Sequence, residues 1–205
     1  MSVPTVERTR SFLEEAELGR RLVHASGCVL PGLYLFTPVT WTHLQMLFVA
    51  GAVLTIVLEA LRHSGRIDWW IYRHLTREYE QETIAGYALY MISSAAVVLL
   101  FEPAVAIPAV LMLMLGDPIS GMAGSGGFRK VKRPRSLLLM FVVSSVIAAP
   151  FLYETPLAVV LGGIGGMIAD GVKPVVRGHV VDDNLTIPPV AATLMLLGIE
   201  LTAVL

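Results

Sequence analysis

Two polar stretches beside apolar runs contain the residue types that bind phosphate and divalent metal ions. The first places Asp117 at the end of an apolar run, before a Gly/Ser-rich stretch that includes Gly121 and Gly124. A cluster of cations comes next and consists of Arg129, Lys130 and Lys132. Glycines let backbone N–H groups approach an anion closely, cations neutralise phosphate charge, and Mg²⁺ takes a carboxylate together with phosphate oxygens. The pattern predicts a metal and phosphate site, or else a flexible loop after a helix that ends at Gly-Asp-Pro.

The second stretch, Asp182-Asp183-Asn184, stands just before the last apolar run. Adjacent carboxylates repel each other, so a bound cation would offset the cost, and hard oxygen ligands suit Mg²⁺. The alternative is a helix N-cap, because Asp or Asn often precedes a helix with Pro in its first turn. One acid suffices for a cap, which leaves the other for metal binding or catalysis. Asp170, at the end of the preceding run, is a further candidate because carboxylates at membrane depth tend to be functional.

A charged face precedes the first apolar run. Glu17, Arg20, Arg21 and His24 are spaced by three, four and seven residues and share one side of a helix. Arg21 and His24 are therefore candidates for contact with a phosphate or a lipid head group. The alternative is an anchor in which long side chains reach the interface and form an internal ion pair.

An acidic turn precedes the third apolar run and contains Glu78, Glu80 and Glu82. Glu78 and Glu82 lie four residues apart, so on a helix they repel unless one of them binds a cation or a hydroxyl. A solvated turn at the membrane interface is the alternative. Glu80 and Glu82 are thus possible members of the site.

The elements that must position these residues are strongly apolar. Of 205 residues, 55% are hydrophobic and only 15% are charged, whereas a soluble domain of this size would expose more charge. Apolar runs fall at about 22–36, 44–61, 84–101, 104–116, 137–152, 156–172 and 187–205. We expect an all-α integral membrane protein of about seven transmembrane helices. A polar segment at 1–17 precedes a single polytopic catalytic domain at 18–205.

Two local patterns refine this expectation. Glu102-Pro103 separates the third and fourth runs, which together are too long for one crossing, so a tight hairpin is favoured over one kinked helix. The glycine-rich run 162–166 is typical of helices that approach each other closely.

All of the positive charge falls in alternate connections between the apolar runs. The 15 basic residues occur before the first run, between the second and third, between the fourth and fifth, and between the sixth and seventh. With seven spans, the positive-inside rule places the N-terminus in the cytoplasm and the C-terminus outside. The sequence thus predicts a multi-pass protein of the cell membrane whose active site faces the cytoplasm. The basic loop at 129–135 lacks interleaved aromatics, so nucleic acid is not expected as a partner.

The order of these motifs resembles the polyprenol kinase family, which includes dolichol kinase, phytol kinase and the CTP-dependent diacylglycerol kinases. That family is distantly similar to the phosphatidate cytidylyltransferases. The similar elements are the Glu-x-x-Arg-Arg-x-x-His entry at 17–24, the Glu-rich turn into Gly-Tyr at 80–87, the Gly-Asp loop at 116–132 and Asp-Asp-Asn-Leu-x-Ile-Pro at 182–188. The chain departs from the family after the basic loop, where Arg135-Ser136 is followed by leucines and not by a Glu-Gly-Ser-like stretch.

The resemblance implies a CTP-dependent, Mg²⁺-assisted kinase that phosphorylates a long-chain isoprenoid or other lipid alcohol, of the dolichol, polyprenol or geranylgeraniol type. Asp117, Asp182 and Asp183 would hold the metal or activate the hydroxyl, and Asn184 would orient a ligand. Arg129, Lys130 and Lys132 would hold the triphosphate. The alternatives are a cytidylyltransferase that forms a CDP-lipid, and a non-enzymatic transporter or degenerate relative. A dimer is left open.

Overall fold

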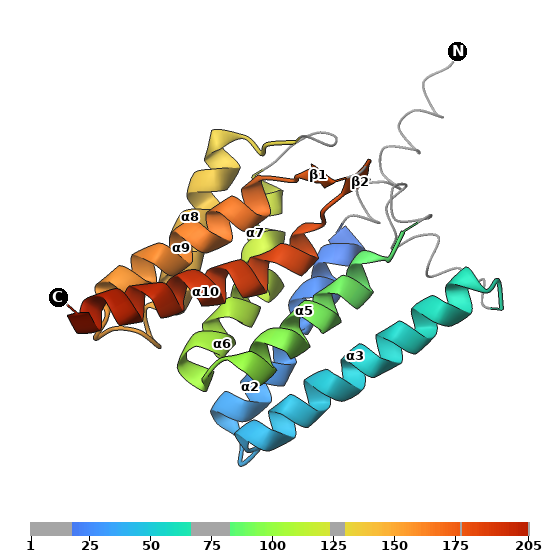
Figure 1. Ribbon diagram of the computed structural model, residues 1–205, viewed down its shortest axis with the longest axis horizontal. Coiled ribbons are helices and arrows are strands. Elements are labelled where there is room, and N and C mark those ends of the chain that lie inside the picture. The colour runs from blue at the N-terminus through green and yellow to red at the C-terminus, as the bar shows by residue number, and fades with distance from the viewer. Residues whose placement is uncertain (1–17, 67–82, 124–129, 177, 205) are drawn as a thin grey trace.

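The computed structural model of the protein describes residues 18–66, 83–123, 130–176 and 178–204, and for His179 only the backbone. Within these ranges the chain is mostly helical (Figure 1). Residues 18–26 are helical, and the elements that follow are α2 (Val29–Phe36), α3 (Trp41–His63), α5 (Gly86–Leu100), α6 (Pro103–Leu111), the π-helix η2 (Met112–Gly116), α7 (Asp117–Met122), α8 (Pro134–Ala148), α9 (Pro156–Gly171), β1 (Val175–Val176), β2 (His179–Val180) and α10 (Asp183–Val204).

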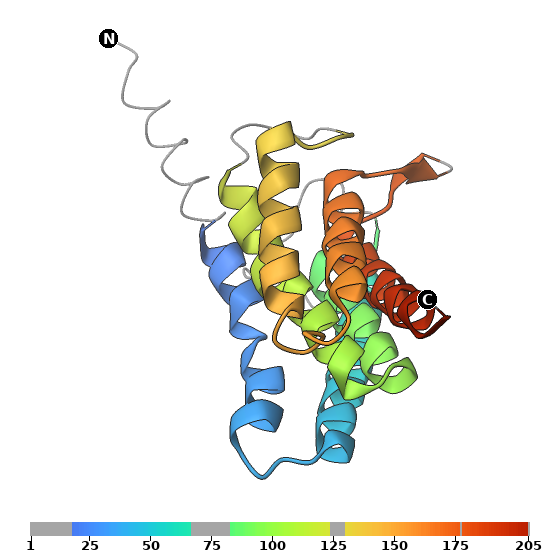
Figure 2. The same cartoon turned by 90° about the vertical axis from the view of Figure 1, so that its left-hand side faces the viewer.

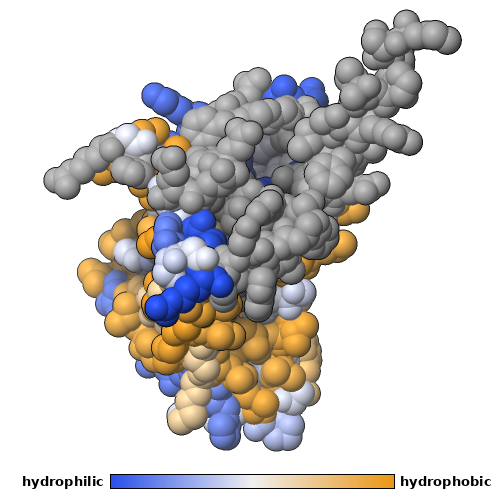
Figure 3. Space-filling model, turned by 90° about the vertical axis from the view of Figure 1, so that its right-hand side faces the viewer, coloured by the Kyte–Doolittle hydropathy of each residue, from blue (hydrophilic) through white to orange (hydrophobic). Residues whose placement is uncertain are grey.

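The helices agree with an all-α membrane protein. Three of them are long and apolar enough to cross a membrane, namely Trp41–His63, the continuous stretch Pro103–Met122, and Asp183–Val204. Helices α5, α8 and α9 are apolar but shorter. Hydrophobic residues cover most of the coloured surface in Figure 3. Each of the seven apolar runs coincides with a helical segment of the described chain, while the number of crossings stays a prediction.

Prolines and an extended residue set where the helices begin. Helices α6, α7, α8 and α9 each have a proline in their first turn, where its missing N–H costs no hydrogen bond. Glu102 is extended (φ −65°, ψ 154°) between α5 and α6, so the chain turns there. The runs on either side of Glu102-Pro103 are therefore two helices, as the hairpin prediction required.

The centre of the fold is built on α6, η2, α9 and α10. Ile107, Met112 and Leu113 are completely buried. A Cβ added at Gly165 would lie 2.9 Å from the Cα of Ala191, and one added at Gly198 would lie 2.4 Å from the Cα of Ala158. The glycines therefore let the α9 and α10 backbones touch, which confirms the close approach predicted for the glycine-rich run.

Two of the described connections lie at opposite ends of the bundle. The turn between α2 and α3 is at the bottom of Figures 1 and 2, whereas the β1–β2 hairpin is at the top. The hairpin pairs Val175 with Val180 and Val176 with His179, and Gly178 takes the positive φ (85°) that closes its turn. A further bridge pairs Val131 with Val172. The connections after α7 and α9 thus add short stretches of strand pairing to a fold that is otherwise helical.

Candidate metal and phosphate site

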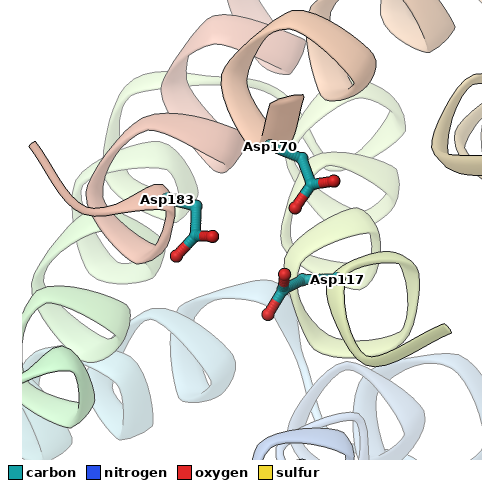
Figure 4. A group of neighbouring side chains, drawn as sticks. All are labelled: Asp117, Asp170 and Asp183. Carbon is teal, nitrogen blue, oxygen red and sulfur yellow. The ribbon is translucent and has the colours of Figure 1, made fainter. Parts of the chain in front are cut away.

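Three carboxylates point toward one another (Figure 4) at the end of the bundle that carries the β1–β2 hairpin, which we call the polar end. Asp117 begins α7, Asp170 lies in the last turn of α9, and Asp183 begins α10. One oxygen from each lies within 4.8 Å of the others. The exposed fractions of the side chains are 14% for Asp117, 0% for Asp170 and 1% for Asp183. Three carboxylates that lie this close together and are this deeply buried repel each other, so nearby cations must offset the repulsion.

A π-turn positions Asp117. Residues 112–116 form the π-helix, and the Asp117 N–H donates to the carbonyl of Met112, five residues back. Pro118 has no N–H and so cannot continue the ordinary four-residue pattern. The extra residue in the turn changes the direction of the next side chain, and single π-turns often occur at functional sites. The π-turn of η2, together with Pro118, therefore sets the direction in which the Asp117 side chain points.

The other two carboxylates lie near the ends of their helices, where hydrogen bonds hold the Asp170 side chain and the start of α10. The Ser120 hydroxyl on α7 donates to Asp170 Oδ2 at 2.9 Å. The Thr186 hydroxyl on α10 donates to the Ala169 carbonyl at 3.2 Å, which ties the start of α10 to the end of α9. Asp170 and Asp183 are thus held on rigid elements and not on loops.

Asp182 does not join the three carboxylates. Its Oδ1 accepts hydrogen bonds from the backbone N–H of Asn184 at 2.9 Å and from the Asn184 side-chain amide at 2.6 Å. The Asn184 carbonyl in turn accepts from the Ser93 hydroxyl at 2.6 Å. Of the two acids considered for capping and for metal binding, Asp182 caps α10 and Asp183 enters the cluster. Asp170 takes the place that the sequence analysis gave to Asp182.

Two lysines contact the carboxylates. Lys132 Nζ lies 2.5 Å from Asp170 Oδ1, 3.3 Å from Asp117 Oδ1 and 3.9 Å from Asp183 Oδ2. Lys173 Nζ lies 2.5 Å from Asp183 Oδ2. Burial alone lowers the pKa of Lys132, but the charges of the three carboxylates outweigh it and hold this pKa above its usual value. The Lys132 ammonium group is therefore charged in the fold.

A backbone bridge holds the two lysines side by side. The Lys132 N–H donates to the Gly171 carbonyl, and the Lys173 N–H donates to the Lys130 carbonyl, both at 2.9 Å. Since side chains alternate along paired strands, Val131 and Val172 lie on one face and the lysines on the other. Exposure agrees: the two valines are 54% and 44% exposed, against 19% for Lys132 and 8% for Lys173.

The helix at 18–26 contributes a histidine beside the cluster. His24 Nδ1 lies 3.6 Å from Asp117 Oδ2, and the imidazole packs edge-on against Tyr90 with 4.7 Å between ring centroids. The Tyr90 hydroxyl donates to the His24 carbonyl at 3.1 Å. Arg21 donates from Nη2 to the Gly121 carbonyl at 3.1 Å, which fixes this helix against α7.

The structure thus brings together five of the predicted residues: Asp117, Asp170, Asp183, Lys132 and His24. Lys130 is exposed at the edge of the site and takes part in the bridge through its backbone. Four predicted members lie outside the described residues, namely Gly124, Arg129, Glu80 and Glu82.

Sequence reasoning missed Lys173. The signal in the sequence is that a lysine follows Asp170 by only three residues. The basic residues of this loop were interpreted only as evidence for membrane orientation. Nothing in the local pattern shows that this side chain turns inward, because its direction depends on the pairing with the loop that contains Lys132.

The donor set fits a hard divalent cation. Mg²⁺ prefers carboxylate oxygens together with water and phosphate oxygens, and the three carboxylates offer that chemistry from three helices. The two lysines add donors that bind phosphate. Comparison with models of known protein families, with curated proteins and with solved structures returns no match. Proposals about function therefore rest on the site itself.

Proposed function

We propose that this chain is a lipid-alcohol kinase. In this proposal it transfers the γ-phosphate of a nucleoside triphosphate, CTP by the resemblance of its motifs, to a long-chain isoprenoid or similar alcohol. The observation that carries the proposal is the convergence of Asp117, Asp170 and Asp183 with Lys132 and Lys173 at the polar end of an apolar helix bundle. Phosphoryl transfer needs positioning and charge neutralisation more than covalent chemistry by the protein.

Each group has a role in this scheme. Asp117, Asp170 and Asp183 would hold Mg²⁺, which supplies charge neutralisation for the triphosphate when it is bound. Lys132 and Lys173 bind phosphate oxygens, and the exposed Lys130 adds a cation at the edge of the site. Arg129 lies outside the described residues and stays a predicted phosphate ligand. Asp182 and Asn184 keep the first turn of α10 in place, so that Asp183 points into the site.

The reaction balances with a carboxylate as proton acceptor. The alcohol oxygen forms a bond to the γ-phosphorus, and the bond from that phosphorus to the β,γ-bridging oxygen breaks. The electron pair leaves with the nucleoside diphosphate. The hydroxyl proton passes to Asp117, which is the most exposed of the three carboxylates and faces His24.

The apolar surface suits a lipid acceptor. The exposed side chains of α3 include Val49, Val53 and Ile56, so the body of the bundle presents hydrocarbon next to its polar end. An alcohol in the bilayer can keep its tail there and present its hydroxyl at the interface. With the N-terminus inside and seven crossings, this end faces the cytoplasm, where nucleotide is available.

The proposal is tested with full-length protein purified in detergent, γ-labelled CTP, Mg²⁺ and geranylgeraniol or dolichol. We expect labelled lipid phosphate and an equal amount of CDP. Asp183→Asn should abolish the product, whereas Glu154→Gln, in the connection before α9, should leave it unchanged. Absence of lipid phosphate with every nucleotide and alcohol tried would overturn the proposal. Release of pyrophosphate with a CDP-lipid would assign a cytidylyltransferase in its place.

A further inference from the structure

The two lysines contact one oxygen of each of the three carboxylates that could hold a metal ion. Lys132 contacts Asp170 Oδ1 and Asp117 Oδ1, and Lys173 contacts Asp183 Oδ2. Each of the three carboxylates therefore has an ammonium group within 3.3 Å of one of its oxygens. A divalent cation and these ammonium groups compete for the same negative charge.

The lysines can leave the carboxylates without unfolding the site. Each one is a point charge on a flexible four-carbon stem and does not form the rigid fork of an arginine. Their backbones stay fixed by the Val131–Val172 bridge and its two 2.9 Å hydrogen bonds. Rotation of the side chains is thus enough to move the ammonium groups, while the bridge keeps them within reach of anything bound at the carboxylates.

We propose that Lys132 and Lys173 are exchangeable counter-ions that make metal binding and phosphate binding cooperative. Without metal, they neutralise the carboxylates. When metal and phosphate arrive together, the metal takes the carboxylates and the lysines pass to the phosphate oxygens. Metal alone must displace the lysines without giving them a new partner, and phosphate alone must draw them away from the carboxylates. This inference rests on the proposed function for the identity of the physiological phosphate, and it adds Lys173 to the phosphate-binding groups.

Exchange of the lysines between carboxylates and phosphate predicts that metal binding and phosphate binding are thermodynamically coupled. Each ligand should raise the affinity for the other by an equal factor, on the order of tenfold to a hundredfold. Removal of one ammonium group should then have opposite effects on the two ligands. The metal alone should bind more tightly, because it has less to displace, and phosphate should bind more weakly.

The experiment uses full-length protein in detergent. Binding of Mn²⁺ alone is followed by electron paramagnetic resonance, and binding of inorganic triphosphate by calorimetry, in EDTA and in excess Mn²⁺. Lys173→Met is compared with Arg135→Met, which removes a cation from the exposed first turn of α8. Lys173→Arg keeps the charge, and Lys132→Met repeats the measurement if Lys173→Met does not fold.

For Lys173→Met we expect Mn²⁺ affinity to rise about tenfold and the coupling factor to fall to a few-fold, with Arg135→Met close to the native protein. Lys173→Arg should restore much of the coupling. Unchanged or weaker Mn²⁺ binding in Lys173→Met, or no coupling in the native protein, would overturn the inference. Coupling with triphosphate in a protein without kinase activity would reject the proposed function and leave the inference standing. Lipid phosphorylation without coupling between the two ligands would support the proposed function and reject this inference.

Discussion

Two buried acidic sites lie in this bundle, and they are held in different ways. Glu59 on α3 is clamped by Arg62, whose Nε and Nη2 donate to its two oxygens at 3.0 and 2.7 Å. The Tyr87 hydroxyl and the Ala85 N–H donate to the same carboxylate at 2.5 and 3.2 Å. The carboxylates of Asp117, Asp170 and Asp183 are contacted mainly by lysine side chains.

The groups that contact each set of carboxylates indicate which of the two sites is structural. The Arg62 fork, a backbone amide and a ring hydroxyl are fixed donors, and Arg62 also donates to the Thr83 carbonyl at 2.6 Å. These contacts join the end of α3 to the start of α5, and the more exposed His63 lies further away, with Nε2 3.7 Å from Glu59 Oε2. Lysines are mobile point charges and can be displaced. We infer that the Glu59 clamp stabilises the fold, whereas the three-carboxylate cluster is built to change partners.

The largest effect should follow loss of a charge in the cluster. We expect Asp117→Asn to lower the rate of lipid phosphate formation by about a thousandfold, because a metal ligand and the proton acceptor are both weakened. The unfolding temperature should not fall, since the change relieves repulsion with Asp170 and Asp183. Initial rates and thermal unfolding in detergent check both statements. A large loss of stability would mean that the cluster is structural, like Glu59.

The opposite result is expected at the clamp. Arg62→Met leaves the buried Glu59 carboxylate without its main cation, and the free energy of unfolding should fall by about 3 kcal/mol. Folded protein should still bind Mn²⁺ with native affinity. Denaturant unfolding measures the free energy of unfolding, and electron paramagnetic resonance measures the affinity for Mn²⁺. Weaker metal binding with normal stability would contradict the assignment.

A smaller effect is expected from the π-turn. Pro118→Ala supplies an N–H that allows an ordinary helical turn before α7, and this would rotate Asp117 away from Asp170. We expect about a tenfold loss of activity with unchanged or higher stability. Ile119→Ala, at an exposed neighbouring position, is the control. Equal activity in both variants would show that η2 does not position the carboxylate.

The smallest effect concerns pH. The pKa of Lys132 is raised in the fold, so its stabilising contribution is fully present below the pKa of a free lysine and is lost only as the pH rises through the higher folded value. The difference in unfolding temperature between the native protein and Lys132→Met should therefore stay constant from pH 7 to about pH 10. A difference that shrinks within this range would place the folded pKa too low for the contacts described.

The sequence predicted what depends on local pattern. Apolar runs gave the helices, Glu102-Pro103 gave the turn, and the glycine-rich run gave the close packing of α9 on α10. Asp117 and Lys132 follow from the order of an acid, a Gly/Ser-rich stretch and clustered cations after an apolar run. Asp170 follows from the rule that a carboxylate at membrane depth tends to be functional.

The features that the sequence did not predict depend on contacts between segments that are distant in the sequence. Adjacent Asp182 and Asp183 look alike in the sequence, and only the turn before α10 decides that one caps and the other enters the cluster. Lys173 turns inward because its backbone pairs with Lys130, more than forty residues earlier. The Val131–Val172 bridge forms for the same reason, whereas β1 and β2 pair locally across the turn at Gly178.

The central claim is that the three carboxylates hold the metal used in phosphoryl transfer. The most direct measurement is the initial rate of lipid phosphate formation from CTP as a function of Mg²⁺ concentration, for the native protein and Asp170→Asn. We predict saturation by Mg²⁺ in the native protein, no product in EDTA, and a Mg²⁺ requirement at least tenfold higher in Asp170→Asn. The same Mg²⁺ dependence in both proteins, or product formed in EDTA, would contradict the account.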